Sequence, residues 1–267
     1  MIHSESQPPR DTCSNSASKL DKYLSLISSI KNNTCYNKIT KRIIKAIIPT
    51  HVFGHISNMG ELIKLCKKYK LILIEDASEA LGSYYKNKHA GTFGKIGVLS
   101  FNGNKIMTTG AGGAVITNSK NLADRVRFLS TTSKSYRKNN LIYNEVGYNY
   151  KMPSLNAAMG IGQLKKFEEI KKNKKNLFKQ YEKVFSNYRN IKVIKSPKNC
   201  ESNYWLNAIK LKNTNFSKLF DIANRENIQI RKIWSLISMG KAYRKYPKMK
   251  LNISKNLSKS IICFPSG

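Results

Sequence analysis

The sequence predicts an α/β fold, in which a mostly parallel sheet is followed by a smaller α/β unit. A strand–helix–strand order runs through residues 44–76, and parallel strands need a crossover of this kind. The closing run LILIED is apolar on both faces, as expected of a strand buried within a parallel sheet. Further short strands and helices follow a long helical pattern that starts near Pro153.

The first part of the pattern is predicted to hold most of the sheet. The run KRIIKAIIPTHVFG is rich in β-branched residues and is closed by Pro49 and Gly54. The stretch SNMGELIKLCKKYK has helical spacing, and Asn58 and Glu61 stand in the positions of a capping box. Two more strands, IGVLSF and GAVITN, flank a glycine-rich loop, and SKNLADRVRFLS is predicted to be a helix.

On this basis the chain divides into three parts. Residues 1–40 are expected to be a polar lead-in, partly disordered, with one helix in SKLDKYLSLISSIKN. Residues 41–165 form the larger unit, and residues 166–267 form the linking helix and the smaller unit. One continuous helix is predicted from Leu155 to Phe185, because a proline precedes an unbroken helical pattern. Beyond it, IKVI, NYWLNAIKL and IQIRKIW are predicted strands, and FSKLFDIANREN is a predicted helix.

The composition is strongly basic, with 48 Lys and Arg, 15 Asp and Glu, and a net charge of +33. Such a charge favours anionic partners, so a basic nucleic-acid-binding module is one alternative, with steeply salt-dependent binding. The charge is spread through every segment, however, and no known nucleic-acid motif accompanies it. A coding bias toward lysine explains it more simply, and we expect no specific nucleic-acid partner.

The apolar runs and the cysteines indicate a cytoplasmic protein. The longest apolar runs are far too short to span a bilayer, and the amino-terminus has no apolar core typical of a signal peptide. The five cysteines are dispersed, without metal-ligand spacing or paired motifs. We therefore expect reduced thiols, no metal site and no membrane partner.

Polar residues stand where two predicted parallel strands end, and open α/β sheets bind ligands at this edge. Asp76 closes LILIED, Ser100 closes IGVLSF, and Lys105 follows in the glycine-rich loop. A carboxylate can hold a protonated heterocyclic nitrogen, a hydroxyl beside a glycine turn can bind phosphate, and a lysine can capture a carbonyl. Together these are the parts that a pyridoxal phosphate enzyme needs. Separately, each residue also has a common structural role as a turn former, cap or solvated side chain.

The run from LILIED to GAVITN resembles the core signature of the DegT/DnrJ/EryC1/StrS family of sugar aminotransferases. The segments EVGYNYKMPSLNAAMGIGQL, NYWLNAI and RKIW are similar to later parts of that family, so the resemblance covers roughly residues 41–267. With HVFGH and SFNGNK, the chain looks most like the branch that aminates UDP-linked 4-keto-6-deoxy sugars in bacillosamine- and legionaminate-type pathways. The resemblance implies fold type I, with a three-layer αβα large domain and a smaller carboxy-terminal α/β domain.

The resemblance also implies a role for several residues. Lys105 matches the catalytic lysine that attaches pyridoxal phosphate, and Asp76 matches the aspartate that pairs with the pyridine nitrogen. Glu79 matches a residue near the phenolic oxygen, and Ser100 matches a serine that contacts the phosphate. Asn149 matches an asparagine that reaches the phosphate bound by the neighbouring subunit, which implies a homodimer.

Three further residues are assigned in the same way. Arg231 and Trp234 lie in the block associated with binding the nucleotide sugar, and His51 matches a histidine near the active site or serves the structure alone. The implied reaction is a ping-pong transfer of an amino group from glutamate to the C4 ketone of a nucleotide-linked 4-keto-6-deoxy sugar, for surface-polysaccharide or glycan biosynthesis. A related branch that dehydrates sugars has histidine at the position of Lys105, so transamination is favoured.

One departure from the family leads to an alternative function. Family members carry a segment on the order of 100 residues before the strand of KAIIPTHVFG, about the size of a small domain. That segment includes a helix amino-terminus that binds the cofactor phosphate, and residues 1–40 do not match it. The alternative is a truncated, catalytically inactive homologue or gene fragment that acts only with a partner polypeptide.

Overall fold

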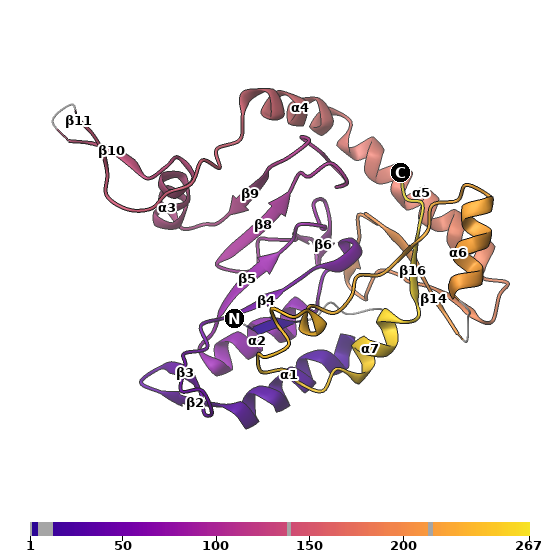
Figure 1. Ribbon diagram of the computed structural model, residues 1–267, viewed down its shortest axis with the longest axis horizontal. Helices are drawn as coiled ribbons and strands as arrows, with labels where there is room; N and C mark the ends of the chain where they lie inside the picture. Colours follow the sequence, from indigo (N-terminus) through magenta and orange to yellow (C-terminus); the bar gives the residue numbers. More distant parts are fainter. Residues whose placement is uncertain (1, 5–12, 138–139, 213–215) are drawn as a thin grey trace.

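The computed structural model describes residues 2–4, 13–137, 140–212 and 216–267 (Figure 1). Its helices are α1 Cys13–Ile27, α2 Met59–Tyr69, α3 Lys120–Ser130, α4 Ser154–Lys165, α5 Phe167–Phe185, α6 Phe216–Arg225 and α7 Asn252–Ser258. Two short 3₁₀ helices span Val52–Gly54 and Ile237–Met239. In the described ranges, none of the helices is long and apolar enough to cross a lipid bilayer.

The larger sheet has five strands in the order β1-β4-β5-β8-β9. Its strands are β1 Ile2–Ser4, β4 Ala46–Pro49, β5 Ile72–Asp76, β8 Ile96–Ser100 and β9 Gly113–Ile116. The first four are parallel, and β9 is antiparallel to β8. The predicted strand–helix–strand unit is confirmed as β4, α2 and β5, and the α/β class with it.

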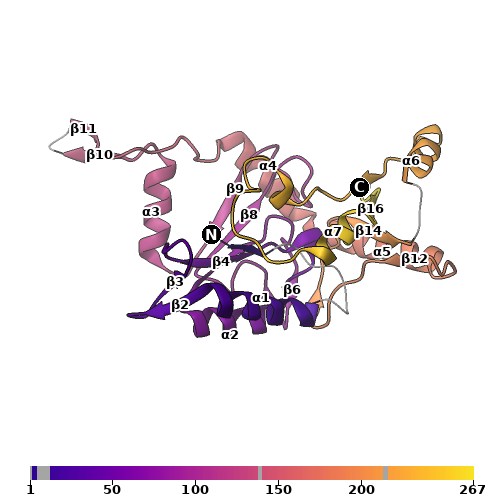
Figure 2. The same ribbon diagram turned by 60° about the horizontal axis from the view of Figure 1, so that its bottom comes forward.

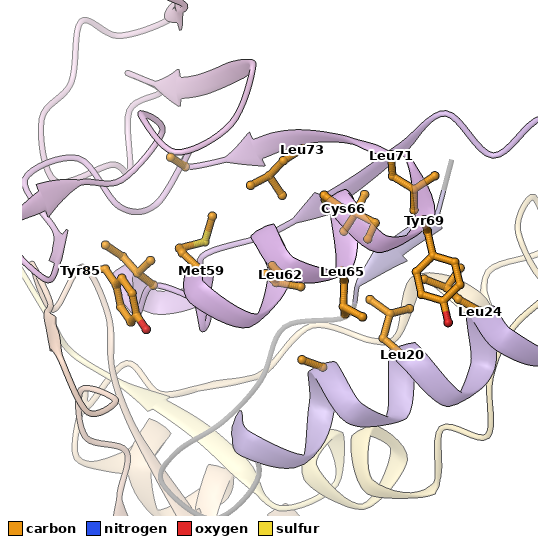
Figure 3. Close-up of a cluster of buried hydrophobic side chains, with 14 of the residues drawn as sticks. Leu20, Leu24, Met59, Leu62, Leu65, Cys66, Tyr69, Leu71, Leu73 and Tyr85 are labelled. Carbon is orange, nitrogen blue, oxygen red and sulfur yellow. The ribbon is translucent and has the colours of Figure 1, made fainter. Parts of the chain in front are cut away.

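Helix α2 begins where the capping signal predicts. The Asn58 side chain accepts a hydrogen bond from the Glu61 backbone N–H at 3.3 Å. The apolar stripe of α2 then packs between the sheet and α1, as Figure 3 shows for Leu20 and Leu24 beside Leu65. Burying a leucine of this kind stabilises the fold by about 2 kcal/mol, so this cluster anchors the sheet from one side.

Helices α1 and α2 cover one face of the larger sheet (Figure 2). Leu73 points into this cluster and is 7% exposed. Ile72, Val98 and Val115 are 40%, 37% and 42% exposed in this chain. The prediction that LILIED is buried on both faces was therefore wrong, because both helices pack on the same face.

Two predicted helices also differ from the structure. The pattern from Leu155 to Phe185 is broken at Lys166, which has φ −103° and ψ 2°. Its amphipathic second half packs as α5 on the smaller sheet, whereas its apolar first half, α4, is largely exposed. The helix predicted in SKLDKYLSLISSIKN ends at Ile27, where a hairpin begins.

That hairpin pairs β2 Ser28–Lys31 with β3 Thr34–Asn37. Asn32 and Asn33 both have positive φ, which suits a two-residue hairpin turn, and this local signal was missed. Strand β1 pairs with β4, so the lead-in also contributes to the sheet. The expected disorder falls partly on residue 1 and residues 5–12, which lie outside the described residues.

The smaller sheet is antiparallel, with the order β12-β14-β16-β15. Its strands are β12 Ile191–Val193, β14 Asn207–Leu211, β16 Ile261–Phe264 and β15 Arg231–Lys232. The remaining strands are β6 Tyr84–Tyr85, β7 Lys88–His89, β10 Lys134–Arg137, β11 Asn140–Tyr143 and β13 Cys200–Glu201. The predicted strands in NYWLNAIKL and IQIRKIW are thus shorter than expected, and α6 is confirmed.

Several contacts join the part around the smaller sheet to the rest of the chain, and two of them involve strands of the structure. Strand β13 pairs with β6, and Phe53 packs into a cluster with Ile261 of β16. Both contacts lie beside the segment that follows β5, where the strand-end residues are found. The division of the chain at residues 40 and 165 stays a prediction.

Candidate active site

Asp76 and Ser100 end neighbouring parallel strands on the same face of the sheet. Asp76 is in register with Val98, which lies two residues before Ser100, so side-chain alternation gives the three residues one face. This is the face away from α1 and α2. The Asp76 carboxylate accepts hydrogen bonds from Thr50 Oγ1 at 3.4 Å and from the Ser78 N–H at 3.2 Å. These bonds fix the carboxylate at the carboxyl end of β5.

Lys105 lies in the loop between β8 and β9. A turn forms there because the Lys105 N–H donates to the Asn102 carbonyl oxygen at 3.0 Å. The loop is closed at its base by the Phe101 N–H, which donates to the Gly112 carbonyl oxygen at 3.0 Å. Gly112 has φ +113°, which a side chain would strain. The turn leaves the Lys105 side chain half-buried, with Nζ 4.2 Å from the centroid of the Trp205 ring.

Glu79 follows β5 and lies within electrostatic reach of both Lys105 and Asp76. Its Oε2 accepts a hydrogen bond from the Phe53 N–H at 2.8 Å. Burial raises the pKa of Glu79 to about 7; the Phe53 N–H and Lys105 oppose this shift, and Asp76 adds to it. The carboxyl can therefore hold or release a proton near neutral pH.

This shift predicts how stability depends on pH. A carboxyl whose pKa is raised on folding contributes stability that is present below its ordinary pKa and is lost as pH rises through the folded value. The free energy of unfolding of the wild-type protein is expected to fall by about 2 kcal/mol more between pH 5 and 8 than that of Glu79→Gln. Urea unfolding followed by circular dichroism at several pH values tests this, and equal pH slopes in the two proteins would contradict it.

His51 is wholly buried and belongs to a structural network. Its Nε2 lies 3.0 Å from Glu75 Oε2, and its Nδ1 accepts from the Ser57 N–H at 3.3 Å, so the neutral ring donates through Nε2. Burial acts to raise the pKa of Glu75, but the bonds from His51 and from the N–H groups of Gly94 and Gly91 lower it below its usual value. Of the two roles considered for His51, the structural one matches these contacts.

The tryptophans of the chain stack on each other beside Lys105. Their ring centroids are 6.1 Å apart with an interplanar angle of 9°, and the Trp234 ring lies 5.8 Å from that of Phe53. Trp234 is 52% exposed, whereas Trp205 is 2% exposed. The structure thus brings the predicted residue Trp234 to the site. Trp205 and Phe53 were not predicted as site residues. They lie in the segments NYWLNAI and HVFGH, which carried the family resemblance without a role for either residue.

Arg231 lies on β15, in register with Cys263 of β16. Burial raises the pKa of the Cys263 thiol to about 12. The negative charge of Glu79 adds to this shift, and the positive charge of Arg231 opposes it, so both charges act electrostatically on the thiol. Asn149, by contrast, is exposed and forms an isolated backbone bridge with Thr131 at the end of α3. Its assignment to the cofactor site stays a prediction.

Comparison with known proteins shows which family the sequence matches. The sequence model of the DegT/DnrJ/EryC1/StrS aminotransferase family matches residues 28–267. Over 232 residues the chain is 32% identical to "Putative pyridoxal phosphate-dependent aminotransferase EpsN" of Bacillus subtilis, covering 84% of this chain and 58% of that protein. Over 172 residues it is 37% identical to GDP-perosamine synthase of Escherichia coli O157:H7, covering 64% of this chain and 46% of that protein. The chain thus spans about half the length of these relatives.

A solved structure shows the same fold. The structure of a DegT DnrJ EryC1 StrS aminotransferase from Brucella abortus aligns with a TM-score of 0.81 at 23% identity, over 94% of this chain and 64% of that one. At this identity the likeness shows the fold alone. The prediction of fold type I is confirmed.

The family and the name of EpsN indicate pyridoxal phosphate as the cofactor, and the residues present fit it. The Asp76 carboxylate suits a protonated ring nitrogen, and the half-buried Lys105 amine suits a carbonyl carbon. The Ser100 hydroxyl, on the same sheet face as Asp76, accepts a hydrogen bond from the Asn102 N–H at 3.4 Å, and its own proton can be donated to a phosphate oxygen. The set therefore supplies a partner for each reactive end of the cofactor.

Proposed function

The chain belongs to the DegT/DnrJ/EryC1/StrS aminotransferase family, and from this premise we propose that its site transfers an amino group to a keto carbon of a nucleotide-linked sugar. One observation carries the proposal: Asp76 and Ser100 end neighbouring parallel strands on one face of the sheet, and the loop of Lys105 directly follows β8. A carboxylate, a hydroxyl and a primary amine are thus offered at one edge of the sheet.

The finer proposal concerns the two substrates. Glutamate is the amino donor, and the acceptor is the C4 ketone of a UDP-linked 4-keto-6-deoxy sugar. The motifs HVFGH and SFNGNK support this acceptor, and the product serves surface-polysaccharide or glycan biosynthesis in the cytoplasm. Arg231 and Trp234 are assigned to the nucleotide sugar, because an exposed guanidinium and an exposed indole suit a diphosphate and a flat base.

In the proposed mechanism, pyridoxal phosphate supplies a carbonyl that captures amines and a ring that withdraws electrons from the adjoining carbon. The Lys105 Nζ would hold the carbonyl carbon of the cofactor and, when free, would move a proton between the two reacting carbons. The Asp76 carboxylate would keep a proton on the ring nitrogen. The Glu79 carboxyl, with its pKa of about 7, would hold or release a proton at the same site.

We also propose that two copies of the chain complete the site. Helix α4 is apolar around most of its circumference, yet Leu155, Ile161 and Leu164 are 86%, 60% and 57% exposed. A helix of this kind is normally buried, so a second copy is the expected cover. Asn149 is exposed nearby in the sequence, and from one copy it would reach the phosphate held by the other.

The half-reaction with glutamate tests the proposal. Purified protein mixed with pyridoxal phosphate is expected to turn yellow and to lose this colour when L-glutamate is added, because the amino group moves to the cofactor. The aminated protein is then mixed with UDP-linked and GDP-linked 4-keto-6-deoxy sugars, and return of the colour identifies the acceptor. A protein that binds pyridoxal phosphate but never responds to glutamate would contradict the proposal and favour the inactive homologue.

A further inference from the structure

Trp205 contacts both the amine and the loop of Lys105. Its ring centroid lies 4.2 Å from Lys105 Nζ. Its indole Nε1–H donates to the carbonyl oxygen of Asn104 at 2.6 Å, directly before Lys105 in the chain. Trp205 is 2% exposed, whereas Lys105 is half-buried, so the ring side of the contact with Nζ is shielded from water.

Trp205 is itself firmly held from the Glu79 side of the site. Asn203 Oδ1 accepts a hydrogen bond from the Trp205 N–H at 2.9 Å. The Asn203 Nδ2 donates to the carbonyl oxygens of Glu79 and Leu81 at 2.9 Å and 2.8 Å. The Asn203 side chain therefore couples the position of Trp205 to the segment that carries Glu79.

A tryptophan ring attracts an ammonium group more strongly than any other aromatic side chain, and more so when water is excluded. A lysine side chain is otherwise flexible, with many accessible rotamers. We propose that Trp205 is a positioning residue for Lys105. Its ring holds the Lys105 Nζ at the site, and its indole N–H fixes the turn that carries the lysine. The inference deepens the proposed function, because a lysine released during amino transfer must stay beside the reacting carbons.

Competitive labelling tests the contact without any cofactor. The protein is treated with a limiting amount of acetic anhydride, and acetylation of Lys105 is measured by mass spectrometry relative to exposed Lys120. Trp205→Leu is expected to raise the relative labelling of Lys105 by about tenfold, since both the ring contact and the burial are lost. Trp205→Phe keeps a ring face and is expected to raise it by about threefold or less.

Phe178→Leu is the matched control, because it also removes a buried aromatic ring. The Phe178 ring stacks on that of Tyr204, with 4.1 Å between the centroids, whereas Lys105 Nζ lies over the ring of Trp205. In this control the labelling of Lys105 is expected to equal that of the wild type. Circular dichroism and thermal unfolding show whether each variant is folded. If Trp205→Leu does not fold, the labelling of Lys105 in Trp205→Phe tests the proposal. Folded Trp205 variants with wild-type labelling of Lys105 would overturn the proposal.

A kinetic measurement separates this inference from the proposed function. In Trp205→Phe, kcat for amino transfer is expected to fall about tenfold, while KM for the nucleotide sugar changes less than threefold. A purely structural role would instead lower the active fraction and leave kcat per active site unchanged. If the wild type shows no amino transfer, the proposed function fails, and the labelling comparison still decides whether Trp205 positions Lys105.

Discussion

Replacing Lys105 with alanine is expected to lower the rate of amino transfer by at least about 10³-fold, because one amine both attaches the cofactor and moves the proton. The side chain is only half-buried, so losing its contact with the tryptophan ring is expected to lower stability by about 1 kcal/mol or less. The measurement is a single-turnover reaction of the aminated protein with the nucleotide sugar. It is followed by the return of the cofactor's absorbance.

Lys67→Ala is the control for this variant, since Lys67 is an exposed lysine of α2. It removes the same charge from a chain with a net charge of +33, so any general electrostatic effect appears in both variants. Equal rates for Lys105→Ala and Lys67→Ala would show that the reaction uses another group.

Replacing Glu75 with alanine is expected to lower the free energy of unfolding by roughly 3–5 kcal/mol, because several buried hydrogen-bond donors lose their acceptor at about 1–3 kcal/mol each. The Glu75 side chain is fully buried beside His51 at 3.0 Å. Its oxygens also accept the N–H groups of Gly91, Phe93 and Gly94 at 2.8, 2.6 and 2.7 Å. All these donors would be left unpaired, and each such group is destabilising when buried. Urea unfolding followed by circular dichroism measures the change.

The exposed Glu169 of α5 provides the matched control, and Glu169→Ala is expected to change stability by less than about 0.5 kcal/mol. The pH dependence gives a second test. Because the pKa of Glu75 is lowered on folding, its contribution is present above the ordinary pKa and is lost as pH falls through the folded value. The difference between wild type and Glu75→Gln should thus shrink in acid. A difference that grows in acid would contradict the account.

The strand-end residues could be predicted because their signals are local. Asp76 and Ser100 directly follow apolar runs, and strand alternation alone fixes which face they share. The start of α2 was equally local, since Asn58 and Glu61 lie three residues apart. The loop of Lys105 was placed at the same edge of the sheet because it directly follows the strand that ends at Ser100.

The aromatic side of the site could not be predicted in this way. Trp205 reaches Asn104 across 101 residues, and Trp234 meets Phe53 through folding of the smaller sheet against the 3₁₀ helix Val52–Gly54. Phe53 also adopts φ 60°, a left-handed conformation that sequence does not suggest for a phenylalanine. The apolar composition of LILIED likewise could not show that α1 and α2 pack on one face only, because both faces look alike in sequence.

The most direct test is to find which amine the cofactor attaches to. Protein mixed with pyridoxal phosphate is reduced with borohydride, digested, and analysed by mass spectrometry for the peptide that carries the cofactor. We predict one dominant site at Lys105 in a chain with 48 lysines and arginines, because in the proposed site Asp76, Glu79 and Ser100 would hold the rest of the cofactor. Label spread over exposed lysines, with Lys105 no more modified than the others, would contradict the account.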